Sequence, residues 1–238
     1  MTKWNELYKY PASTRSLIDG KRHYAVGETE DGQKLPSVTT ILSATQSEEK
    51  RESLANWRQK VGEKEANAIM NDAAKRGTAM HSYLENYLLS LKTGRRKLDL
   101  TDIGIQARIM GEEIIKQGFG DLNEVWGVEA TLYYPERYAG TTDLCGRYKG
   151  KDSILDFKQT NKPKREEWIE DYFIQLAAYA MAHNKVYDTK IDQGVVLMCS
   201  KDGYFQKFMV EGQRFMDFKD KWKRKLDEYY SKIDKRTL

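Results

Sequence analysis

The amino-acid sequence predicts an α/β fold of the α+β type, with a central mixed sheet that is flanked by helices. From Thr101 onward, the hydrophobic periodicity changes in the order helix, three strands, helix, strand (αβββαβ). The 238 residues can bury one sizeable core, and a hydrophobic content of 39% is ordinary for a globular protein. No linker, internal repeat or low-complexity segment divides the chain, so we expect a single domain over residues 1–238.

Residues 1–97 are expected to form an N-terminal arm and a helical region, and residues 98–238 the core. In the arm, Lys21–Val26 is typical of a strand, closed by a turn at Asp31 and Gly32. Three helices are expected next, at Pro36–Ser43, Ser47–Val61 and Glu63–Leu91. Because a glycine costs about 1 kcal/mol inside a helix, we expect a cap or a kink at Gly77.

The core is expected to begin with an amphipathic helix at Thr101–Gly118. Three strands follow, with the sequences VEATLYY, TTDLCGRY and SILDFK, and Gly150–Asp152 forms the turn between the last two. Alternation in the first strand places Val128, Ala130 and Leu132 on one face and Glu129 on the other. The remaining elements are a helix at Glu166–His183, strands at Gln193–Cys199 and Tyr204–Val210, and a C-terminal helix with an apolar stripe that docks on the core.

Three acidic residues and a lysine lie on these strands: Glu129, Asp143, Asp156 and Lys158. Strand side chains alternate, so Asp156 and Lys158 point the same way, and Asp143 on the partner strand can lie beside Asp156. Carboxylates gathered on one sheet face are costly to bury without a partner, and Mg²⁺ prefers oxygen ligands. The pattern therefore predicts a divalent-metal site, with Lys158 near an attacking water or a phosphate. A surface hairpin with an ordinary D-x-K ion pair is the alternative.

Basic residues are concentrated in one stretch of a chain whose formal net charge is only +4. The segment from Arg147 to Arg165 holds seven basic residues and two acidic ones. Such an excess beside a metal site favours a phosphate backbone as partner. Lys162, Lys164 and Arg165, in the loop after Lys158, are the candidate DNA contacts, although a solvated lysine face is the alternative.

The two cysteines, Cys145 and Cys199, are too few for a disulfide framework, and their apolar strand context predicts buried thiols. No apolar run is long enough to span a membrane. The first ten residues have neither a signal-peptide pattern nor the composition of a mitochondrial leader. We therefore expect a cytoplasmic protein without a membrane partner.

Six motifs in this order resemble the PD-(D/E)XK nuclease superfamily, in its RecB-like exonuclease branch. They are PSVTTIL (Pro36–Leu42), RGTAMH (Arg76–His81), Glu129, AGTTDLCG (Ala139–Gly146), LDFK (Leu155–Lys158) and Q-x-x-x-Y (Gln175–Tyr179). Within that branch, the chain is similar to the mitochondrial genome-maintenance exonucleases and related phage exonucleases. The resemblance implies a restriction-endonuclease-like core, with the N-terminal helical region over the active site.

The resemblance also implies roles for residues that the pattern alone leaves open. His81 would bind the metal together with Asp143, Asp156, the Phe157 carbonyl and Glu129, the last directly or through water. Without the family motif, His81 would be taken for a structural residue. Some RecB-like nucleases carry a four-cysteine iron–sulfur cluster, which two cysteines cannot form.

DNA contacts are implied in the same way. Gln175 and Tyr179 lie four residues apart on one helix face and would hold the DNA phosphate, although plain helix amphipathicity is the alternative. Arg76 and Thr78 are weaker candidates for phosphate contacts.

The sequence thus predicts a monomeric DNA exonuclease that depends on Mg²⁺ or Mn²⁺ and acts in DNA repair, recombination or replication. Asp143, Asp156, Glu129 and Lys158 are the expected catalytic residues, and single-stranded DNA or DNA ends the expected substrate. Two alternatives are a duplex-end resection nuclease of the phage recombination type and a non-catalytic DNA-binding protein on a nuclease scaffold.

Overall fold

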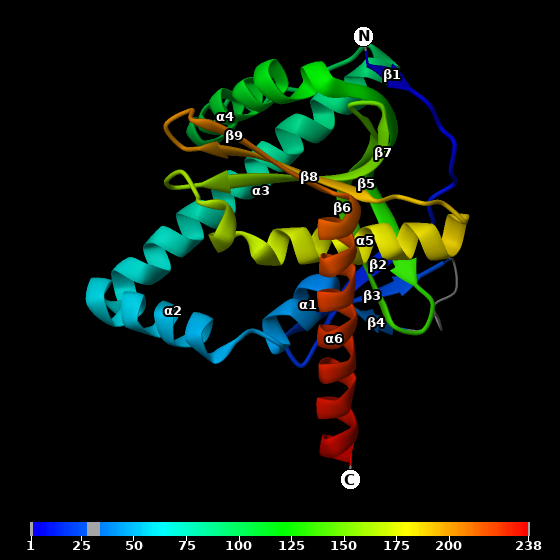
Figure 1. Ribbon diagram of the computed structural model, residues 1–238. Coiled ribbons are helices and arrows are strands. Elements are labelled where there is room, and N and C mark those ends of the chain that lie inside the picture. The colour runs from blue at the N-terminus through cyan, green and yellow to red at the C-terminus, as the bar shows by residue number, and fades with distance from the viewer. Residues whose placement is uncertain (1, 28–33, 238) are drawn as a thin grey trace.

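The computed structural model describes residues 2–27 and 34–237, and the turn predicted at Asp31 and Gly32 lies outside them. A six-stranded mixed sheet, in the order β1-β5-β6-β7-β8-β9, forms the centre of the molecule (Figure 1). Its strands are β1 (Lys3–Trp4), β5 (Leu122–Tyr134), β6 (Tyr138–Tyr148), β7 (Lys151–Thr160), β8 (Gln193–Ser200) and β9 (Phe205–Glu211). Strand β6 is antiparallel to both β5 and β7, β7 and β8 are parallel, and β9 returns antiparallel to β8.

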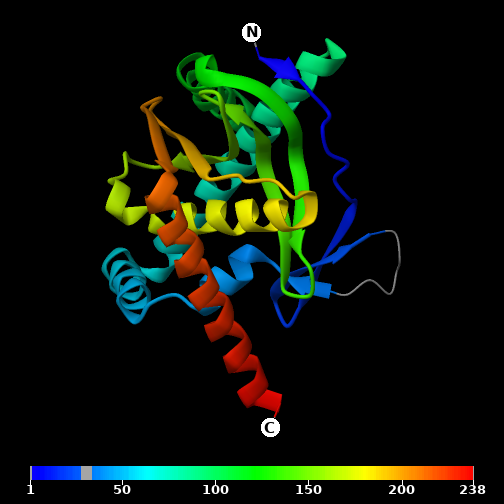
Figure 2. The same cartoon turned by 45° about the vertical axis from the view of Figure 1, so that its right-hand side comes forward.

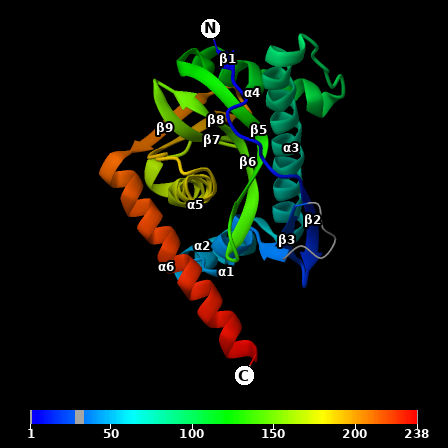
Figure 3. The same cartoon turned by 90° about the vertical axis from the view of Figure 1, so that its right-hand side faces the viewer.

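Helices cover both faces of this sheet (Figure 3). One face carries α3 (Glu63–Thr93) and α4 (Asp102–Gly118), which bury Met80, Leu84 and Met110 against Leu155 and Phe157. The other face carries α5 (Glu170–Tyr187) and α6 (Gly212–Thr237). The order α4-β5-β6-β7-α5-β8 confirms the predicted αβββαβ core. Among the described residues, no helix is long and apolar enough to cross a membrane.

The N-terminal segment contains a second sheet that the sequence analysis did not predict. Strands β2 (Ser13–Ile18), β3 (Lys21–Val26) and β4 (Lys34–Pro36) form an antiparallel sheet, and α1 (Val38–Ala44) follows directly. Figure 2 shows this sheet and α1 together beside the lower end of β5 and β6. The first helix begins at Val38 rather than at Pro36, because Pro36 belongs to β4 and Ser37 caps the helix by accepting from the backbone N–H of Thr40 at 2.9 Å.

The predicted interruption at Gly77 is wrong. After α2 (Glu48–Val61) the chain turns at Gly62, where φ is +86°, and α3 then continues through Gly77 without a break. A Cβ at Gly77 would lie 3.5 Å from the Cγ of Gln159, so the helix packs closely against the end of β7 at this point. We attribute the continuity to the tertiary contacts on both sides of Gly77, which outweigh a propensity cost of about 1 kcal/mol.

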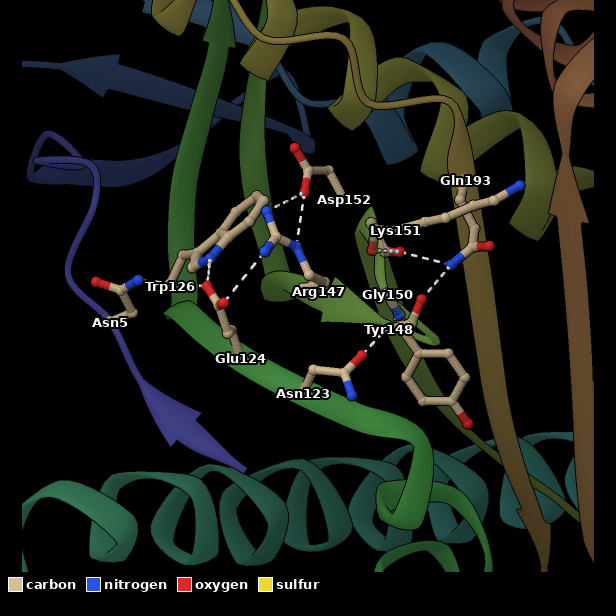
Figure 4. Close-up of polar contacts among 11 residues, drawn as sticks. Asn5, Asn123, Glu124, Trp126, Arg147, Tyr148, Gly150, Lys151, Asp152 and Gln193 are labelled. Atoms are coloured by element: carbon tan, nitrogen blue, oxygen red, sulfur yellow. Dashed lines mark hydrogen bonds and ion pairs between the residues drawn. The ribbon is translucent and has the colours of Figure 1, made fainter. Parts of the chain in front are cut away.

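The β6–β7 hairpin turns one residue earlier than predicted. Lys149 and Gly150 occupy the turn with φ of +50° and +78°, and Tyr148 pairs with Lys151. A polar network fixes this end of the sheet (Figure 4): the Arg147 guanidinium donates to Glu124 at 3.2 Å and to Asp152 at 3.1 Å. These contacts hold β5, β6 and β7 in register at the end of the sheet opposite to the residues described next.

The C-terminal helix α6 docks as predicted. Its apolar stripe is buried on the α5 face of the sheet and consists of Phe215, Phe218, Trp222, Leu226 and Tyr229. Both cysteines are buried free thiols, as expected.

Candidate active site

The candidate active site lies where β6 and β7 separate. Their ladder runs from Tyr148–Lys151 to Leu144–Leu155, and the next residues, Asp143 and Asp156, are not paired through the backbone. The N–H of Phe157 donates instead to the Asp143 carboxylate (Oδ2) at 2.5 Å. The separation of the strands makes room between them, and the backbone holds one carboxylate at its edge.

His81 reaches this point from α3. Its Nδ1 lies 3.3 Å from Asp143 Oδ1, and its Nε2 lies 2.8 Å from the carbonyl oxygen of Phe157. Burial lowers the pKa of His81, but the Asp143 carboxylate more than offsets this and raises it to about 9. Burial likewise disfavours the charged form of Asp143, but His81 and Lys158 hold the pKa of its carboxyl below its usual value. The ring is therefore an imidazolium between two oxygen atoms.

Glu129 adopts an unusual backbone conformation, with φ of +49° inside β5. Glu129 interrupts the alternation that the sequence predicted: Val128 packs on the α3–α4 side of the sheet, whereas Ala130 and Leu132 pack on the α5 side. The Glu129 carboxylate has an oxygen within 4.8 Å of ligand atoms of both His81 and Asp143. Partial desolvation and the Asp143 carboxylate raise the pKa of Glu129 to about 7.

Asp156 and Lys158 point the same way, as predicted from strand alternation. The Lys158 Nζ lies 2.5 Å from Asp156 Oδ2 and 4.9 Å from the centre of the Tyr172 ring. Burial and Asp143 raise the pKa of Asp156 to about 6, although Lys158 opposes the shift. Burial alone would lower the pKa of Lys158. The carboxylates of Asp156 and Asp143 outweigh burial and raise this pKa above its usual value, so the ammonium stays charged.

The donor set fits a divalent metal ion. One ligand atom each from His81, Glu129 and Asp143 lie within 4.8 Å of one another. Carboxylate oxygens together with one imidazole nitrogen suit Mg²⁺, Mn²⁺ and similar ions. The Phe157 carbonyl accepts a hydrogen bond from the same imidazole, so the imidazolium lies between two oxygen atoms that could ligate a cation. An ion would have to displace the proton of His81.

Five of these side chains border one pocket of about 510 Å³: His81, Glu129, Asp143, Asp156 and Lys158. Gln175 and Tyr179 line it from α5, and Thr78 lines it from α3. Tyr179 lies so close to β6 that a Cβ at Gly140 would be 2.7 Å from its hydroxyl oxygen. Arg76 does not line the pocket, because its guanidinium donates to Asn161 at the end of β7.

The predicted basic contacts lie elsewhere. Lys162, Lys164 and Arg165 do not line the pocket; the backbone of Lys164 exchanges hydrogen bonds with Gln206 of β9, and the Arg165 guanidinium lies over Trp168. The expectation that the whole basic stretch adjoins the site is wrong for its first three members, Arg147, Lys149 and Lys151. They belong to the β6–β7 hairpin at the other end of the sheet. There Arg147 pairs with Glu124 and Asp152, Lys149 pairs with Asp121, and Lys151 pairs with Glu211.

Two arginines that the sequence analysis did not assign to the site line the pocket from the small sheet. They are Arg15 on β2 and Arg22 on β3, together with Tyr24, Ser37 and Thr39. Arg22 lies in the predicted strand, and Ser37 and Thr39 lie in the PSVTTIL motif. Because these residues are far from Asp143 in the sequence, the sequence pattern did not indicate that they line the same pocket.

No protein-family model matches the sequence. The chain is 27% identical over 213 residues to mitochondrial genome maintenance exonuclease 1 of Xenopus tropicalis, and 25% identical over 217 residues to that of Homo sapiens. These alignments cover 85% and 83% of the chain, and it spans 59% of each relative's length. The crystal structure of a provisionally named exonuclease from Eubacterium rectale aligns with a TM-score of 0.49 at 15% identity, over 68% of this chain and 66% of that one.

The relatives confirm the resemblance to the exonucleases. The relatives are named as mitochondrial proteins, whereas the sequence pattern of this chain predicts the cytoplasm, so its compartment stays a prediction.

Proposed function

We propose that this chain is a metal-dependent DNA exonuclease that hydrolyses phosphodiester bonds at the ends of single-stranded DNA. The observation that carries the proposal is the meeting of His81, Glu129 and Asp143 within 4.8 Å, in one pocket with the Asp156–Lys158 pair. These residues come from one helix and three strands, and a metal-dependent nuclease needs this combination of carboxylates, an imidazole and an ammonium. The exonuclease relatives agree with it.

His81, Asp143, Asp156 and the Phe157 carbonyl are the proposed metal ligands, and Glu129 completes the set directly or through a water. Once bound, a divalent ion would polarise the phosphate and lower the pKa of a water ligand. The imidazole nitrogen makes Mn²⁺ as suitable as Mg²⁺.

Lys158 has the role of stabilising negative charge on the phosphate. Its ammonium is held by Asp156 and by the face of the Tyr172 ring, so it is positioned before the substrate arrives. Gln175 and Tyr179 would donate to phosphate oxygens from α5, and Thr78 from α3. Arg76, Lys162, Lys164 and Arg165 are proposed to contact DNA beyond the pocket.

The test is digestion of end-labelled linear single strands, linear duplexes and circular single strands, with Mg²⁺, with Mn²⁺ and with EDTA. We expect metal-dependent loss of linear single strands only, no activity in Lys158→Ala, and full activity in the control Lys116→Ala, which changes an exposed lysine of α4. Preferential loss of duplex ends would indicate a resection nuclease. Cleavage of circles would indicate an endonuclease, and binding without cleavage a non-catalytic DNA-binding protein.

Two further properties are proposed from the sequence. We expect a monomer, which gel filtration tests, and a cytoplasmic location, which fractionation of the source cells tests.

A further inference from the structure

The catalytic pocket shares lining residues with three other cavities. The cavity beside α1, called the α1 groove, has a volume of about 300 Å³ and shares Arg22 and Thr39 with the pocket. The α3 groove shares Thr78 and Ser82, and the β5 groove shares Glu129 and Thr141. A DNA strand longer than the pocket can continue along one of these three.

Their charges differ in a way that a polyanion would distinguish. Among residues 2–27 and 34–237, the α1 groove is lined by Lys21 and Arg22 and by no acidic residue. In the described part of the chain, Glu129 is the only charged residue that lines the β5 groove. The α3 groove is mainly apolar and mixes two lysines with one aspartate: Lys75, Lys97 and Asp99. Phosphates are therefore attracted to the α1 groove, whereas the β5 groove offers them no cation.

Lys21 and Arg22 are available to an anion. Both are exposed, and neither forms an ion pair with a carboxylate within the part of the chain that the structure describes. Surface cations without a carboxylate partner lose no existing ion pair when they bind phosphate.

The walls of the groove are held in place by the fold. The carbonyl oxygen of Arg22 accepts hydrogen bonds from the N–H of Ser37 at 2.9 Å and from the hydroxyl of Thr40 at 3.0 Å, so β3 and α1 are joined at this residue. Figure 1 shows α1 next to β3 and β4. Thr39 and Ser43 are four residues apart on the exposed side of α1, where their hydroxyl groups can reach a phosphate oxygen.

We propose that the α1 groove is the track for the phosphate backbone of the DNA strand, holding the phosphates next to the scissile one. Lys21 and Arg22 contact these phosphates from the β2–β3 hairpin, and Thr39 and Ser43 contact them from α1. The proposal rests on the proposed function, since it takes the pocket as the place of cleavage.

The experiment compares Lys21→Glu with Lys75→Glu, which makes the same change in the α3 groove, in the full chain. Fluorescence anisotropy with a labelled 12-nucleotide single strand in EDTA measures Kd as a function of salt. Steady-state cleavage of the same strand with Mn²⁺ measures KM and kcat.

For Lys21→Glu we expect Kd and KM to rise by about 10-fold or more, kcat to change by less than about 2-fold, and the salt slope to fall by about 0.7 for each lost phosphate contact. We expect little change for Lys75→Glu. A larger loss of affinity in Lys75→Glu would move the track to the α3 groove, and equal affinities in wild type and Lys21→Glu would overturn the proposal. If the wild type binds but does not cleave, the proposed function fails, while the anisotropy still decides the track.

Discussion

The Asp143 carboxylate occupies the position that a backbone carbonyl would have in a continuous β6–β7 ladder. It accepts a hydrogen bond from the N–H of Phe157 at 2.5 Å, and Asp143 itself is the first residue of β6 beyond the last backbone pair, Leu144–Leu155. The same carboxylate lies 3.3 Å from the imidazole of His81. Strand separation and the proposed metal ligand are therefore parts of one arrangement, and a change at Asp143 affects both.

Two substitutions of Asp143 are expected to separate these contributions. Asn retains an oxygen that can accept from Phe157, whereas Ala leaves a buried N–H without a partner, at a cost of about 1–3 kcal/mol. Both variants should lose hydrolysis, but Asp143→Ala should have the lower free energy of unfolding. Urea titration and the nuclease assay check this. Equal stability of the two variants would show that the Phe157 contact contributes little.

Glu129 should show a conflict between stability and function. A non-glycine residue at φ +49° is strained, and glycine relieves the strain, so Glu129→Gly is expected to stabilise the protein by up to about 1 kcal/mol. The same change removes a proposed ligand and should abolish activity.

The control is Glu136→Gly in the exposed β5–β6 turn, where φ is +63°. It should be equally stabilising and fully active. Thermal unfolding and metal-dependent hydrolysis distinguish the variants; a destabilised Glu129→Gly would contradict the assignment of strain.

Gly140 is expected to be required for the position of Tyr179. A Cβ there would lie 2.7 Å from the hydroxyl oxygen and 2.9 Å from Cε1 of Tyr179, so Gly140→Ala must displace the ring. We expect a loss of about 1–3 kcal/mol in stability and weaker binding of single-stranded DNA. Gly120→Ala is the matched control, because no heavy atom lies within 4 Å of its added Cβ. If both variants bind equally, Tyr179 does not position the strand.

His183 should make stability depend on pH between about 6.5 and 4. It is buried beside Tyr10, 3.1 Å from its hydroxyl, and burial lowers its pKa from 6.5 to about 4. In that window the unfolded chain binds the proton and the folded chain does not, so this contribution is complete above pH 6.5 and is lost as the pH falls.

The loss attributable to His183 is up to about 3 kcal/mol. Urea titrations at several pH values give the free energy of unfolding as a function of pH. Over this window, that free energy should change less steeply with pH for His183→Gln than for wild type. Identical slopes would mean that His183 is not the group responsible.

Local pattern in the sequence sufficed for the order of the core elements and for much of the pocket. Strand alternation brings Asp156 and Lys158 to one side, and they form the expected pair. Ser37 signalled the start of α1 through its capping side chain. Such features depend on residues within a few positions of one another, where geometry is set by the backbone.

Only the tertiary structure decided features that depend on long-range contacts. It places Arg22 at the pocket, leaves Arg147 at the far hairpin and carries α3 through Gly77. It also holds Glu129 in a conformation that puts Val128 and Ala130 on opposite faces of the sheet. The sequence by itself determined which residues can do chemistry and in what order the elements occur. Which of them meet was decided by packing, because local preferences of about 1 kcal/mol are smaller than the energy of burying whole faces of helices and strands.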